Sequence, residues 1–232
     1  DRVQTQAFLE NPTQRVDLIV PRGGEQLIAF TKKHATCPVI VSGRGNNFVY
    51  INKEADLQKA MDIIINGKTT NIGVCNALDK VLIDSKLPNW EVFAKKLVDE
   101  LKKYKVEILG DTAFANAAQV PTIPNEEIWY EEFLNYKIVV GIVDSNEEAV
   151  AKINKYCGGH SASIITTNDA IAQEFMEQVD CAAVYQNAST RFTDGGQFGL
   201  GAEIGISTQK LHARGPFALE KLVTEKWVIL GD

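Results

Sequence analysis

Cys75 is the residue of this sequence whose surroundings most favour a role as a nucleophile. It lies in residues 71–80, NIGVCNALDK, on a glycine-preceded turn between a helix that is expected to end near Gly67 and a strand. A thiolate attacks acyl and aldehyde carbons readily, and an ordinary thiol pKa of about 8.5 needs only modest lowering by nearby donors. Asn76 and the backbone amides of the turn would polarise the developing oxyanion. The alternative is a small cysteine buried in the core.

A second segment rich in reactive groups, residues 187–216, keeps neither the two-residue period of a strand nor the 3.6-residue period of a helix. Its six glycines allow the backbone to turn and to approach a ligand closely. Donors suited to a carboxylate or a phosphate are supplied by Asn187, Ser189, Thr190, Arg191, His212 and Arg214. The segment is therefore interpreted as a binding loop, with an ordinary long surface loop as the alternative.

Alternating strands and helices are expected to position these two segments. The first unit is an apolar strand that ends at Pro21, followed by Gly23, Gly24 and a helical pattern over 25–33. Further strands are predicted over 37–43, 47–52, 78–84, 106–111, 137–144, 161–166, 181–187 and 224–232. Helices are predicted over 55–68 and 90–104, after Ser145 with Glu148 three residues on, and between the strands at 161–166 and 181–187.

Strands joined through helices favour a largely parallel sheet covered by helices on both faces. The last predicted strand, 224–232, is consistent with a plain edge strand and equally with a strand that pairs with another subunit.

The composition excludes several classes of partner. The chain has 232 residues, of which 45% are hydrophobic, and it carries a net charge of −6. This charge argues against a nucleic-acid surface, because no basic stripe is available to displace counterions from phosphates. No apolar run has the length of a membrane span and the amino terminus lacks a signal-peptide pattern, so a small-molecule ligand and a cytoplasmic location are expected.

The four cysteines are widely spaced and are expected to be reduced thiols. The pairs His34 with Cys37 and Cys157 with His160 have a spacing sometimes seen in zinc sites. Each pair supplies only two ligands, so no metal is expected. Cysteines other than Cys75 are interpreted as structural.

Four segments, 16–24, 68–77, 155–166 and above all 187–216, resemble the gamma-glutamyl phosphate reductases, or glutamate-5-semialdehyde dehydrogenases, of the aldehyde dehydrogenase superfamily. The resemblance implies the carboxy-terminal portion of an enzyme of proline biosynthesis. It also implies an α/β fold, in which a three-layer aldehyde-dehydrogenase-like catalytic domain over 44–216 follows a remnant of a Rossmann-like cofactor domain over 1–43. Residues 217–232 would form a carboxy-terminal strand and a possible oligomerisation arm.

The resemblance further implies a two-step reaction. Cys75 would attack gamma-glutamyl phosphate, expel phosphate and form a thioester, which NADPH then reduces to the semialdehyde. Gly23 and Gly24 would let the nicotinamide end approach, and Glu132 would hold the nicotinamide ribose. The six donors of 187–216 would anchor the substrate.

Two of those donors have an alternative explanation. For Arg191, a bidentate grip on the glutamyl carboxylate and a structural ion pair with Asp194 or Glu203 are both consistent with the sequence. His212 is equally consistent with an ordinary loop histidine.

One absence bears on the reaction type. Relatives that hydrolyse their thioester carry a glutamate base just before a glycine pair that corresponds to the region of Gly43, where this chain has Val41 and Ser42. A base that activates water would destroy the thioester, so its lack favours a reductase. The chain also departs from the pattern of the family at Arg44, Asn47, Phe48, Asn71, Ile72 and Ala162.

Two other functions remain open at this point. The chain could be a non-catalytic fragment or assembly domain, which NADPH binding would distinguish from an enzyme. It could also be another aldehyde dehydrogenase that oxidises an aldehyde, which the missing glutamate argues against. A small-molecule substrate and a homo-oligomeric full-length enzyme are the expected partners.

Overall fold

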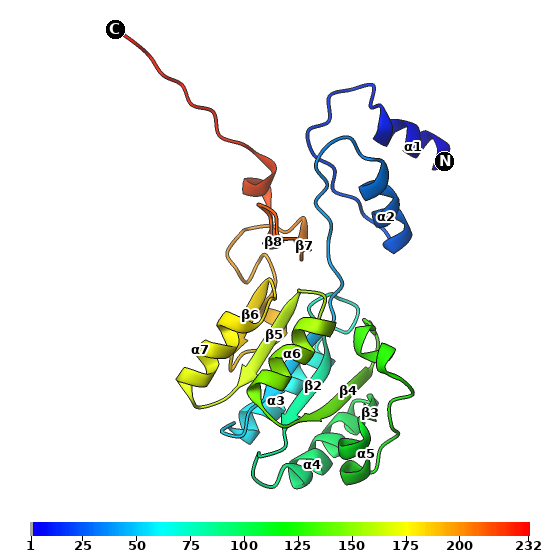
Figure 1. The fold of residues 1–232 in the computed structure, drawn as a ribbon, viewed down its shortest axis with the longest axis vertical. Coiled ribbons are helices and arrows are strands. Elements are labelled where there is room, and N and C mark those ends of the chain that lie inside the picture. The colour runs from blue at the N-terminus through cyan, green and yellow to red at the C-terminus, as the bar shows by residue number, and fades with distance from the viewer. Residues whose placement is uncertain (1) are drawn as a thin grey trace.

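The computed structural model describes residues 2–232, and its central feature is a six-stranded parallel sheet with the strand order β3-β4-β2-β1-β5-β6 (Figure 1). The strands are β1 (Asn47–Ile51), β2 (Leu78–Asp84), β3 (Glu107–Gly110), β4 (Lys137–Val143), β5 (Ser161–Ile165) and β6 (Ala183–Gln186). The helices are α1 (Arg2–Glu10), α2 (Glu25–His34), α3 (Leu57–Thr69), α4 (Trp90–Lys103), α5 (Thr112–Ala118), α6 (Asn146–Tyr156) and α7 (Asp169–Gln178).

Helices cover both faces of the sheet, which confirms the predicted three-layer α/β arrangement. On one face, α3, α4 and α5 supply Ile64, Leu97 and Phe114 to a core with alternate strand residues. On the other face, α6 and α7 pack Ile153 and Phe175 against the opposite side chains of the same strands. Because side chains alternate along a strand, each buried strand contributes to both cores.

Local signals in the sequence explain where several helices begin. Ser145 accepts a hydrogen bond from the amide of Glu148 and so caps α6, as its spacing from Glu148 predicts. Asp56 caps α3 by accepting bonds from the amides of Gln58 and Lys59. These caps satisfy amides that have no partner within the helix.

Two of the predicted strands are reduced to isolated bridges. The segments expected as strands before Pro21 and over 37–43 meet only through a parallel bridge between Ile19 and Val39, and Ser42 forms one bridge with Ser207. The apolar residues of these segments indicate burial, but a strand also requires a second strand that pairs with it along its length. The short helices α1 and α5 were not predicted.

The predicted strand over 224–232 is also wrong for the single chain. Residues 223–232 have no regular structure and extend away from the sheet (Figure 1). Trp227 and Leu230 are 86% and 90% exposed, so no strand of this chain lies beside them. A plain edge strand is therefore excluded.

The end of the chain before this tail forms a small antiparallel pair, β7 (Gly205–Ser207) with β8 (Gly215–Phe217). Three short 3-10 helices, η1 (Glu126–Tyr130), η2 (Thr190–Phe192) and η3 (Leu219–Leu222), complete the described structure. No helix among residues 2–232 combines the length and the apolar character needed to cross a membrane.

Candidate active site

Cys75 lies on the turn just before β2, and two neighbouring backbone segments enclose it. The side-chain amide of Asn47 donates to the carbonyl oxygens of Cys75 at 2.7 Å and of Ala77 at 2.7 Å, and to that of Gly45 at 3.1 Å. A methyl group built on Gly45 would overlap the carbonyl of Cys75, so only glycine allows this approach. Asn47 therefore fixes the turn that carries the thiol.

The electrostatic surroundings of Cys75 oppose the sequence-based expectation. Burial, followed by the charges of Glu203 and Glu132, raises the pKa of the thiol to about 11, while the charge of Arg191 acts in the opposite direction. The expectation was a modest lowering of the pKa by nearby donors. It failed chiefly because the thiol is buried, and also because two carboxylates from segments far from Cys75 in the sequence lie near it.

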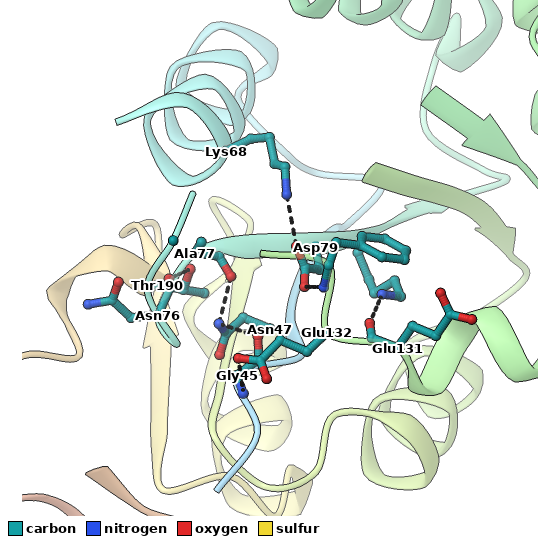
Figure 2. Close-up of polar contacts among 12 residues, drawn as sticks. Gly45, Asn47, Lys68, Asn76, Ala77, Asp79, Glu131, Glu132 and Thr190 are labelled. Carbon is teal, nitrogen blue, oxygen red and sulfur yellow. Dashed lines mark hydrogen bonds and ion pairs between the residues drawn. The ribbon is translucent and has the colours of Figure 1, made fainter. Parts of the chain in front are cut away.

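Asn76 links the Cys75 turn to the loop that begins at residue 187. Its side-chain amide donates to the carbonyl oxygens of Thr193 at 3.0 Å and of Arg191 at 3.3 Å, and its own oxygen accepts a bond from the Arg191 guanidinium. Thr190 donates to the carbonyl of Asn76 at 2.9 Å (Figure 2). Both amide hydrogens of Asn76 are thus already committed, so the predicted oxyanion role gives way to a role in holding the loop.

Arg191 forms no ion pair with Asp194 or Glu203 among the described residues, which removes one of its two predicted explanations. Its guanidinium binds Asn76 while its Nε atom is buried without a hydrogen-bond partner. The structure therefore brings Arg191, Thr190 and Asn76 to the turn of Cys75. Ser189 stays beside them and caps η2 by accepting from the amide of Arg191.

Glu132 lies on the other side of Gly45. Its carboxylate accepts a hydrogen bond of 2.9 Å from the amide of Gly45 (Figure 2). Glu132 also lines a cleft of about 1110 Å³ together with Gly23 and Gly24. The adjacent Gly23 and Gly24 and the distant Glu132, all predicted to bind the cofactor, therefore share one cleft next to the Cys75 turn.

The cleft has room for a ligand at its glycine-lined side. A methyl group built on Gly24 would meet no atom within 4 Å, and Gly23 has a φ of +152° that side chains rarely adopt. Lys32 and Arg44 add positive charge to the lining. Glycine backbone, cationic side chains and the carboxylates of Glu131 and Glu132 are suited to a ligand that carries both phosphate and hydroxyl groups.

Asn187 is not brought to the thiol. Its side-chain amide pairs with both backbone groups of Thr166, at 3.1 and 2.8 Å. Thr166 directly follows β5, whereas Cys75 precedes β2, and these strands run parallel within one sheet. Asn187 therefore lies at the opposite end of the strands, where it stabilises the end of β5.

Arg214 lies in a surface ion-pair cluster, and His212 is exposed, which is consistent with an ordinary loop histidine. Arg214 pairs with the carboxylate of Asp180 at 2.8 Å, and Lys210 pairs with the same carboxylate at 2.5 Å. His212 is exposed on the loop between β7 and β8. This surface ion-pair cluster holds the loop against the start of β6.

Three further residues lie at the site although the sequence did not single them out as site residues. Gly45 and Asn47 contact the backbone of Cys75, and Glu203 raises its pKa. The departure of Asn47 from the pattern of the resembled family was a signal that could have singled it out. Glu203 accepts a bond of 2.8 Å from the amide of Gly195, a contact that no local pattern indicates.

The remaining cysteines show no metal chemistry. No cluster of three or more potential metal ligands exists among residues 2–232. Cys157 and Cys181 are buried with their sulfur atoms 3.2 Å apart, and His160 is buried beside Ser161. Burial lowers the pKa of His160 to about 4, so its ring is neutral at physiological pH.

The model of the aldehyde dehydrogenase family matches residues 6–123 and 118–228. A gamma-glutamyl phosphate reductase of Clostridium botulinum is 48% identical over 217 residues, which are 94% of this chain and 52% of that protein. The chain spans about half the length of the curated relatives that it matches.

Solved structures agree with these matches. The crystal structure of gamma-glutamyl phosphate reductase from Thermotoga maritima superposes with a TM-score of 0.94 at 44% identity and covers 100% of this chain and 55% of that chain. The NADP complex of an NADP-dependent glyceraldehyde-3-phosphate dehydrogenase from Bacillus halodurans has a TM-score of 0.63 at 17% identity, covering 81% and 47%. The second likeness concerns the fold alone.

Proposed function

The chain belongs to the aldehyde dehydrogenase family, and we propose that it carries the reactive cysteine of an enzyme that reduces gamma-glutamyl phosphate to glutamate-5-semialdehyde and phosphate with NADPH. The observation that carries this proposal is the position of Cys75. Its turn lies between the Glu132 cleft on one side and the loop of Thr190 and Arg191 on the other. The names of the most similar relatives supply the substrate.

In the first step, the thiolate of Cys75 attacks the acyl carbon of the acyl phosphate. The bond between the acyl carbon and the phosphate oxygen breaks, phosphate leaves with the electron pair, and a thioester remains on Cys75. Because the pKa of the thiol is about 11, its proton must be released for this step at neutral pH. The backbone amides of the turn remain the candidates for stabilising the oxyanion.

The substrate is assigned to the loop side of the turn. Arg191, held by Asn76, presents a guanidinium suited to a bidentate grip on the glutamyl carboxylate. Ser189 and Thr190 keep the backbone of η2 in place for that grip. Asn187 and Arg214 do not enter this assignment, because their contacts lie elsewhere, and neither does His212, which is exposed on the loop between β7 and β8.

NADPH is assigned to the cleft lined by Gly23, Gly24 and Glu132, where the open space beside Gly24 and the carboxylate of Glu132 fit such a ligand. When bound, its nicotinamide would supply the hydride for the thioester. Residues 1–43 would then belong to a cofactor domain, and 44–216 to the catalytic domain. Lack of a carboxylate at Val41 and Ser42 favours reduction over hydrolysis.

We further propose that the enzyme acts in proline biosynthesis in the cytoplasm as a homo-oligomer. The exposed apolar residues of the tail, Trp227 to Leu230, would pair with a strand of another subunit.

Acylation of Cys75 tests the proposal without a need for hydride transfer. The chain is mixed with glutamate, ATP and a glutamate kinase, which generate gamma-glutamyl phosphate, and released phosphate and the mass of the Cys75 peptide are measured. We expect a glutamyl adduct on Cys75 in the native chain and none in Cys75→Ser, since a hydroxyl is far less nucleophilic than a thiolate. An equal adduct in Cys75→Ser, or none in either chain, would refute the proposal.

A further inference from the structure

We propose that Asp79 and Lys80, adjacent residues of β2, are positioning residues for Glu132, because they hold the backbone immediately before and after it. This inference rests on the proposed function, which assigns Glu132 to the cofactor cleft. Neither residue lines that cleft. Figure 2 shows Asp79, Glu131 and Glu132 on the same side of Asn76 and Ala77.

Asp79 holds the residue that follows Glu132. One carboxylate oxygen of Asp79 accepts a hydrogen bond of 2.9 Å from the amide of Phe133. The other accepts a bond of 2.8 Å from the ammonium group of Lys68. Because Lys68 and Asp79 are 0% and 2% exposed, water does not compete for these bonds, and the carboxylate keeps one orientation.

Lys80 holds the residue that precedes Glu132. Its ammonium group donates to the carbonyl oxygen of Glu131 at 2.7 Å and lies 3.8 Å from the centre of the Phe133 ring. Lys80 is fully buried, and burial is the main reason why its pKa falls to about 7. A buried lysine is costly unless its contacts are good, and here they all go to residues 131 and 133.

The contacts of Asp79 and Lys80 flank Glu132, and the side chain of Glu132 faces the site. Its carboxylate reaches the amide of Gly45, and the backbone of Gly45 touches that of Cys75. The charge of Glu132 also raises the pKa of the thiol. A displacement of Glu132 would therefore be reported by Cys75 even when no substrate or cofactor is present.

The test is a double-mutant cycle of Lys80→Met and Glu132→Gln. Iodoacetamide alkylation of Cys75 is followed against pH by peptide mass spectrometry, which separates Cys75 from the other cysteines. Glu132→Gln should lower the apparent pKa of Cys75, because it removes a neighbouring negative charge. If the pKa of Cys75 falls by about half a pH unit, its alkylation rate at a pH below the pKa rises by about twofold. The larger fraction of thiolate is partly offset by the weaker nucleophilicity of a thiolate with a lower pKa.

If Lys80 acts through Glu132, Lys80→Met should also shift the alkylation profile by about twofold in rate, but have no effect in the Glu132→Gln background. Lys80→Arg should restore the native profile, because it keeps a donor and a cation. Lys152→Met is the matched control, since Lys152 also lies over an aromatic ring, 4.1 Å from the centre of Trp129, but does not hold residues 131–133.

Independent, additive effects of Lys80→Met and Glu132→Gln would overturn the inference, as would an unchanged profile in Lys80→Met. If Lys80→Met does not fold, Phe133→Leu, which removes the ring beneath Lys80 and keeps an apolar side chain, carries the same expectation. The alkylation rate is measured without acyl phosphate or NADPH. Its outcome is therefore independent of the acylation test of the proposed function.

Discussion

The buried pair of Lys68 and Asp79 leads to a prediction whose size and pH dependence can both be worked out. Asp79→Asn keeps the shape of the side chain and an oxygen for the amide of Phe133, but removes the charge that faces Lys68. Breaking a buried ion pair in this way typically costs about 3–5 kcal/mol, because one charge is left without compensation. We therefore expect a loss of that size in the free energy of unfolding at pH 7.

Lys68 limits this loss by releasing its proton. The ordinary pKa of a lysine is 10.5, and burial already lowers the pKa of Lys68, while Asp79 opposes that effect. Without Asp79, the folded chain would hold Lys68 neutral, whereas the unfolded chain would keep it charged. Neutralising it costs about 1.4 kcal/mol for each pH unit below 10.5, or about 5 kcal/mol at pH 7 and about 2 kcal/mol at pH 9.

The sign of the pH effect follows from proton binding. In Asp79→Asn the unfolded state binds one more proton than the folded state between pH 7 and 10.5, so stability rises with pH by about 1.4 kcal/mol per unit relative to the native chain. Urea unfolding at pH 7, 8 and 9, followed by tryptophan fluorescence, measures this slope. Lys68→Met in the Asp79→Asn background is the control and should remove the slope. A penalty below about 1 kcal/mol, or one that does not change with pH, would refute the reasoning.

Four further predictions concern single positions. Glu203→Gln should lower the pKa of Cys75 and raise its alkylation rate at pH 8 by about threefold per unit of pKa, and an unchanged rate would remove Glu203 from the surroundings of the thiol. Gly45→Ala should destabilise the chain by about 1–3 kcal/mol in urea, since its methyl group overlaps the Cys75 carbonyl; native stability would contradict the close approach. In the full-length enzyme Arg191→Ala should chiefly raise the KM for the acyl phosphate, and an unaltered KM would exclude a carboxylate grip. Asp56→Ala should cost about 1 kcal/mol in urea, because α3 loses its cap, while leaving Cys75 alkylation as it is; equal stability would show that the cap contributes nothing.

Much of the scaffold was predictable from the sequence because its signals are local. The apolar runs at 47–52 and 78–84 became β1 and β2, and the pattern over 90–104 became α4 almost to the residue. The turn of Cys75 could also be recognised, since a glycine-preceded turn between a helix and a strand is visible in a few consecutive residues. The run over 224–232 failed because nothing local tells whether a neighbouring strand exists.

The contacts at the site were decided by the order of the strands. Pairing β1 beside β2 puts Gly45 against Cys75, and the return of the chain into β4 brings Glu132 to the same point. The order of the strands also keeps one predicted residue away from the site. Asn187 belongs to the predicted binding loop, but it follows β6 and therefore lies at the other end of the sheet.

The sequence by itself therefore determined most of the helices and strands, the turn that carries Cys75 and the resemblance to a family, all of which depend on neighbouring residues. Only the tertiary structure decided which carboxylates surround the thiol and whether its pKa rises or falls. That outcome depends on burial and on charges contributed by distant segments, and electrostatic energy is a function of distance in space rather than along the chain.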